Sequence, residues 1–159
     1  MEKKIKITRN IIILSLAIII GLITYLIIYN SNKTKIIKNN LKKNNYSEVS
    51  NNIFSKTIDK NNTNINYTYN FNMKKFTKYI KKNNDNNRQE INITLNNNET
   101  QIDYLYQNTS GCKIVQKATY EKNNYKCDIV TKKGNCTSKC DIMLKEAKNF
   151  NKEAKKIIK

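Results

Sequence analysis

The chain has 159 residues, and 30 Lys or Arg against 12 Asp or Glu give it a formal net charge of +18. It holds 29 Asn and 28 Lys but no Pro, His or Trp, a bias typical of A/T-rich coding, so the charge alone is weak support for a polyanionic partner. The lack of His removes the commonest general base and metal ligand, and two arginines are too few to favour specific nucleic-acid recognition.

An uncharged apolar run extends from Ile11 to Tyr29, after a basic tail at residues 1–10. At about 1.5 Å of rise per residue it crosses roughly the 30 Å of bilayer hydrocarbon. The run is longer than the apolar stretch of a cleaved signal peptide, and no Ala-x-Ala-like site follows it. It therefore predicts an uncleaved signal-anchor, a single transmembrane helix over residues 11–29, with a cleaved signal or a buried helix as the alternatives.

Cations flank this run on both sides, and the nearest one sets the expected orientation. Arg9 lies two residues before the run, whereas Lys33 lies four residues beyond Tyr29. Because positive charge is retained on the cytoplasmic side, we expect residues 1–10 inside and residues 30–159 outside the cell membrane, as one extracytoplasmic domain.

Beyond the membrane the periodicity changes from helical to alternating. Thr34 to Lys43 predicts a short helix, which could continue the membrane helix, and Tyr46 to Asp59 fits neither period. Apolar residues then alternate with polar ones, which is typical of strands with one buried face. These residues are Ile65, Tyr67, Tyr69, Phe71 and Met73, then Ile91, Ile93 and Leu95, then Ile102, Tyr104 and Tyr106, then Cys112, Ile114, Ala118 and Tyr120, and finally Tyr125, Cys127 and Ile129.

Asn-rich segments at 83–87 and 96–98, and the segment Glu121–Asn124, separate these strands as turns. The pattern predicts an antiparallel β-meander. From about Thr137 to Ile158, apolar residues recur at spacings of three and four, which predicts an amphipathic helix that covers the sheet. Its expected apolar face is Cys140, Leu144, Ala147, Phe150, Ala154 and Ile157 or Ile158. The predicted class is α+β.

Four cysteines, Cys112, Cys127, Cys136 and Cys140, are the only chemically distinctive cluster. They lack the paired Cys-x2-Cys spacing of a zinc site, and the segment from Cys136 to Cys140 has one residue more than a Cys-x-x-Cys redox motif. We interpret them as structural disulfides, with zinc binding and redox catalysis as the alternatives.

The hairpin register limits how these cysteines can pair. If Glu121–Asn124 is the hairpin loop, Ala118 faces Cys127, and Cys112 lies six residues farther along the same strand. That is on the order of 20 Å, whereas bridged Cα atoms lie within about 7 Å. We expect the pairs Cys112–Cys136 and Cys127–Cys140, with the swapped pairing as the alternative.

The layout of a membrane helix, an antiparallel meander and a C-terminal disulfide is similar to that of type IV pilins. The pilin processing signature is absent, because Asn10 precedes the apolar run and Ser15 occupies the position of the signature Glu. The sequence predicts a membrane-anchored envelope protein with a disulfide-stabilised binding or scaffolding domain and no enzymatic activity, cofactor or metal. An extracytoplasmic thiol-disulfide redox protein and a pilin-like secretion or assembly subunit are the alternatives. Expected partners are the bilayer at residues 11–29 and, weakly, anionic lipids or wall polymers, with no specific nucleic acid.

Overall fold

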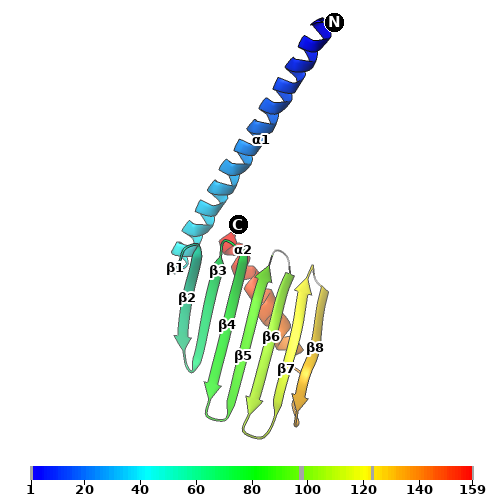
Figure 1. The fold of residues 1–159 in the computed structure, drawn as a ribbon. Coiled ribbons are helices and arrows are strands. Elements are labelled where there is room, and N and C mark those ends of the chain that lie inside the picture. The colour runs from blue at the N-terminus through cyan, green and yellow to red at the C-terminus, as the bar shows by residue number, and fades with distance from the viewer. Residues whose placement is uncertain (1, 97–98, 123, 159) are drawn as a thin grey trace. The chain divides into compact units, whose positions relative to one another are not determined.

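A computed structural model describes residues 2–96, 99–122 and 124–158 (Figure 1). The chain divides into two compact units, one up to Asn40 and one from Leu41. The elements are α1 (Glu2–Lys43), β1 (Ser47–Ser50), β2 (Ile53–Lys60), β3 (Thr63–Asn70), β4 (Lys75–Asn84), β5 (Asn87–Asn96), β6 (Glu99–Asn108), β7 (Lys113–Glu121), β8 (Asn124–Lys133) and α2 (Cys140–Ile158). This confirms the predicted α+β class.

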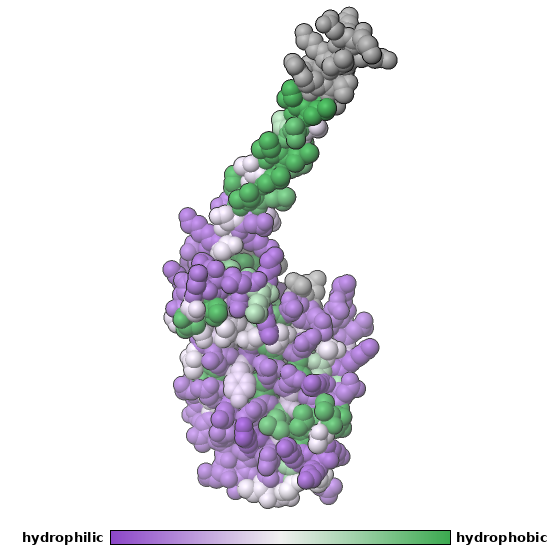
Figure 2. All heavy atoms as spheres, in the orientation of Figure 1, coloured by the Kyte–Doolittle hydropathy of each residue, from purple (hydrophilic) through white to green (hydrophobic). Residues whose placement is uncertain are grey.

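Helix α1 is continuous from the basic tail to Lys43, so the predicted short helix is its C-terminal part. Within the described residues it is the one helix long and apolar enough to cross a membrane, and Figure 2 shows its hydrophobic stretch. The hydroxyls of Ser15 and Thr24 donate to the carbonyls of Ile12 and Ile20, at 2.8 and 2.9 Å. These bonds satisfy two polar groups that hydrocarbon could not hydrate.

The eight strands form one sheet in the order β1 to β8, and each strand pairs antiparallel with the next. The predicted meander is confirmed. The segment that fitted neither period contains β1, a two-residue turn and β2. Its periodicity is broken because the register of β1 against β2 shifts between Glu48 and Ser50.

Strand β3 ends at Asn70, earlier than the alternation through Met73 suggests. The Asn70 side chain accepts a hydrogen bond from the Met73 amide at 3.1 Å, and Lys74 has a φ of 49°. This side-chain bond stabilises a turn in place of further strand. The Asn-rich segment 83–87 is mostly strand, since β4 runs to Asn84 and β5 begins at Asn87. In the two other predicted turns, residues 97, 98 and 123 lie outside the described residues.

The β2–β3 turn consists of Asn61 and Asn62, with φ values of 46° and 60°. Two consecutive positive φ angles match the twist of a two-residue hairpin, and Asn tolerates them better than most residues. In the β7–β8 hairpin, Tyr120 faces Tyr125 and Ala118 faces Cys127, as predicted. A bulge on β8 opposite Val115 and Gln116 then shifts the register.

Helix α2 packs on one face of the sheet, against β5, β6 and β7 (Figure 1). Its buried residues are Met143, Ala147, Phe150, Ala154 and Ile157. Phe150 is fully buried, and its ring centroid lies 5.0 Å from that of Phe76 on β4. The expected apolar face was nearly correct, although Met143 is buried where Leu144 is only half-buried. The helix begins at Cys140 rather than Thr137.

Candidate functional site

The structure joins Cys112 to Cys136 and Cys127 to Cys140, with Cα–Cα distances of 5.4 and 5.9 Å. These are the pairs favoured by the hairpin register. The first connects the start of β7 to the loop after β8, and the second connects β8 to the first residue of α2. The sheet's last hairpin is thereby joined covalently to the covering helix.

The loop after β8 passes very close to the loop before β7. Gly134 has a φ of 69°, and a Cβ added there would lie 2.6 Å from the carbonyl oxygen of Gly111. Only glycine fits this approach, because any side chain would collide with backbone. The close approach brings Cys112 and Cys136 within reach of each other.

Gln116 is the buried polar residue beside the second disulfide, and sequence reasoning missed it. Its side chain is fully buried, its Nε2 donates to Ser138 Oγ at 2.9 Å, and its Oε1 accepts from the Lys139 amide at 2.8 Å. The Tyr125 hydroxyl donates to the Cys140 carbonyl at 2.6 Å. Burial, with a smaller effect of Asp141, raises the pKa of Tyr125 to about 12. These groups have partners, so the arrangement is structural: it fixes the backbone that leads into α2.

The disulfide connectivity differs from that of a Cys-x-x-Cys redox motif. All four cysteines are in disulfides, and neither disulfide joins Cys136 to Cys140. Cys112 and Cys136 are each only 6% exposed. Among the described residues, no group of three or more His, Cys, Asp or Glu could hold a metal ion.

A cluster of charged and phenolic side chains lies between β4 and α2. Lys78 is 6% exposed and points to the helix side of the sheet. Its Nζ donates to Glu146 Oε2 at 3.3 Å and lies 3.9 Å from Glu153 Oε2. The same Nζ lies 5.4 Å from the centroid of the Tyr67 ring. Both carboxylates come from α2, two turns apart on one side of the helix.

Electrostatics keep this buried lysine charged. Burial by itself lowers the pKa of Lys78, but Tyr67, Glu146 and Glu153 together raise it above the ordinary value of 10.5. Burial raises the pKa of Tyr67. Lys78 is therefore a cation held inside the domain and shielded from solvent, which suits it to orient α2 rather than to meet a substrate. The sequence signal was a lysine at an inward position of an alternating strand, between Phe76 and Ile80.

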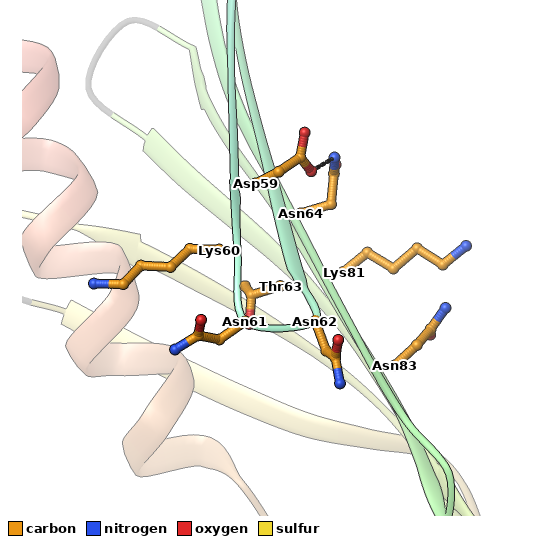
Figure 3. Close-up of a pocket in the computed structure, with 8 residues that line it drawn as sticks. All are labelled: Asp59, Lys60, Asn61, Asn62, Thr63, Asn64, Lys81 and Asn83. Atoms are coloured by element: carbon orange, nitrogen blue, oxygen red, sulfur yellow. Dashed lines mark hydrogen bonds between the residues drawn. The ribbon is translucent and has the colours of Figure 1, made fainter.

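Two shallow depressions occur at the turn end of the sheet that holds the β2–β3 and β4–β5 turns. Figure 3 shows the first, where Asn64 Nδ2 donates to Asp59 Oδ1, while Lys60 extends toward the side of α2 and Lys81 extends away from it. Its lining is Asp59 to Asn64 with Lys81 and Asn83. The second is lined by Asn83 to Arg88 and by Gln107 to Thr109. In the first, the side chains diverge, and both depressions are lined by polar residues of the turns and of the adjoining strand ends.

The two faces of the sheet differ in character. The face opposite α2 is mostly hydrophilic, as Figure 2 shows in the orientation where the strands of Figure 1 pass in front of that helix. Along this open face cations and carboxylates stand opposite each other, as in the cross-strand pairs Lys81↔Glu90 and Asp103↔Lys117. The solvent side of α2 carries mainly lysines.

Comparison of the chain with known protein families, with characterised proteins and with solved structures finds no match. The features of this chain that bear on function are its long apolar helix, its disulfides and the surfaces of the domain.

Proposed function

We propose that this chain is a single-pass protein of the cell membrane whose residues 30–159 lie outside and act as a binding or scaffolding domain of the envelope. The main support for this proposal is that all four cysteines form disulfides in the unit that follows one apolar helix. Structural disulfides persist in oxidising compartments and are rare in the cytosol. The stronger near-flank charge at Arg9 supports the same orientation.

Binding rather than catalysis is proposed on the chemistry of the surfaces. The titratable groups that cluster around Lys78 are packed between the sheet and the helix, and the described cysteines all form disulfides. The domain presents to solvent a mostly hydrophilic sheet face, which Figure 2 shows, and a helix rich in exposed lysines. Such extended surfaces suit contact with a large partner.

Protease added to intact cells tests the orientation. Residues 30–159 should be digested, while a tag placed before Met1 should remain protected until the cells are lysed. Alkylation without prior reduction should leave all four cysteines unmodified, and alkylation after reduction should label them. Protection of the domain together with labelling of unreduced cysteines would place it in the cytosol and reject the proposal.

A further inference from the structure

Helix α2 presents an unbalanced row of positive charge to solvent. Five of its lysines are exposed, and we call them the lysine row: Lys145, Lys148, Lys152, Lys155 and Lys156. The helix has three carboxylates, but Glu146 and Glu153 are directed to the buried Lys78 at 3.3 and 3.9 Å. Only Asp141, in the first turn, remains near the row. The ion pairs that hold the helix on the sheet thus take negative charge away from its outer surface.

The row is continuous along the helix, and among the described residues no side chain forms an ion pair with it. Spacings of three and four residues keep its members on one side, and from Lys145 to Lys156 the rise is about 16 Å. Within the described part of the chain, none of these five lysines lies within 4 Å of a carboxylate.

Lysine abundance alone does not produce this arrangement. The open face of the sheet also carries lysines, but its register puts carboxylates beside them: Lys81 stands opposite Glu90, and Lys117 stands between Asp103 and Asp128. The same composition therefore yields a mixed face on one side of the domain and a cationic row on the other.

The chemistry of the row indicates its partner. A helix that inserts at a membrane surface needs a free apolar face, and the apolar face of α2 is buried on the sheet. Protein hot spots and base recognition favour Arg and aromatic residues, and the exposed row has neither. Lysines act as mobile point charges, which suit repeated phosphates without demanding a fixed geometry.

We propose that the lysine row binds a linear envelope polymer that carries repeated phosphate groups. This inference rests on the proposed function, because such a polymer is met only if the domain lies outside the membrane. The buried Lys78 contributes indirectly, since it holds Glu146 and Glu153 away from the row.

The test uses the full chain in vesicles of zwitterionic lipid, with poly(glycerol phosphate) as the probe and fluorescence anisotropy as the readout. One variant changes all five lysines of the row to Gln. The matched control changes five open-face lysines, Lys75, Lys81, Lys113, Lys117 and Lys126, to Gln, so both variants lose the same net charge. At about 0.1 M salt, where the Debye length is about 10 Å, the row variant should bind at least tenfold more weakly, and the control should stay within about twofold.

Two further measurements test whether the binding depends on the charge of the row. A variant with the five lysines of the row changed to Arg keeps the charge and should keep the affinity. The logarithm of the binding constant should fall with the logarithm of salt concentration, and this slope should flatten only in the row variant, because fewer counterions are released. Far-ultraviolet circular dichroism checks that each variant is folded. If the row variant is unfolded, the triple change of Lys148, Lys152 and Lys155 to Gln replaces it, with an expected loss of at least threefold.

Other outcomes overturn the proposal. Equal losses of polymer affinity in the row variant and the control variant would mean that the net charge of the domain attracts the polymer without a specific site. Row-dependent binding to phosphatidylglycerol vesicles without polymer binding would make a membrane the partner. Absence of polymer binding by the parent chain would reject the site while leaving the protease test of orientation untouched, so the two proposals fail separately.

Discussion

Lys78 occupies a position in β4 where alternation with Phe76 and Ile80 calls for an apolar side chain. It is tolerated because Glu146, which is 68 residues away in sequence, and Glu153 supply negative charge at the same place. A buried cation needs such partners, since leaving it unpaired would cost several kcal/mol. The ion pairs fix how α2 is rotated on the sheet.

Changing Lys78 to Met should lower the free energy of unfolding by about 1–2 kcal/mol near neutral pH. The loss is moderate because the two carboxylates are 29% and 45% exposed and can be hydrated once their cation is gone. Chemical denaturation of the full chain measures it. Lys81→Met, on the opposite face of the same strand, is the control and should change stability by less than about 0.5 kcal/mol.

The loss of stability in the Lys78→Met variant should depend on pH. The pKa of Lys78 is raised in the folded state above its ordinary 10.5. A group of this kind contributes stability that is fully present below its unfolded-state pKa and is lost as the pH rises through the folded-state value. The difference in the free energy of unfolding between the parent chain and Lys78→Met should therefore be constant up to about pH 10 and shrink above it. A difference that grows at high pH would contradict the ion-pair assignment.

At the scale of elements, α2 is attached to the sheet by the Phe150–Phe76 contact and by the Cys127–Cys140 disulfide. The meander and the helix could be predicted because both follow from local periodicity. The end of β3 at Asn70 and the start of α2 at Cys140 could not. Each depends on a competing hydrogen bond: the Met73 amide donates to the Asn70 side chain, and the Lys139 amide donates to the side chain of the distant Gln116.

Removal of either disulfide by paired Cys→Ser changes should lower the free energy of unfolding by about 3 kcal/mol. The sequence separations are 24 and 13 residues, and loop entropy varies slowly with length, so the two losses should be similar. Removing both should cost an amount comparable with the roughly 5–15 kcal/mol stability of a typical domain. Denaturation of the full chain in mild detergent measures each variant. Unchanged stability after loss of either pair would show that the reduced chain holds the same structure unaided.

For the whole molecule, the proposed orientation rests on a charge difference between the two flanks of the apolar run in α1. Changing Lys3, Lys4, Lys6 and Arg9 to Gln should produce a mixed or inverted orientation, because the cations after the apolar run then dominate. Protease protection of the domain in intact cells measures the inverted fraction. The control changes Lys33 and Lys35 to Gln and should keep the domain accessible. Full accessibility after the first change would show that the N-terminal charges do not set the orientation.

Local patterns in the sequence predict the features that repeat over short distances: an apolar run long enough to cross a membrane, alternating strands in a meander, an amphipathic last helix, and the hairpin register that separates Cys112 from Cys127. Packing of the whole domain sets the partners of Lys78, the burial of Gln116, and the contrast between a mixed sheet face and the lysine row. These depend on which distant residues meet when α2 packs on the sheet. A local pattern shows that a face is apolar or charged, but packing decides which charges neutralise each other and which remain exposed to solvent.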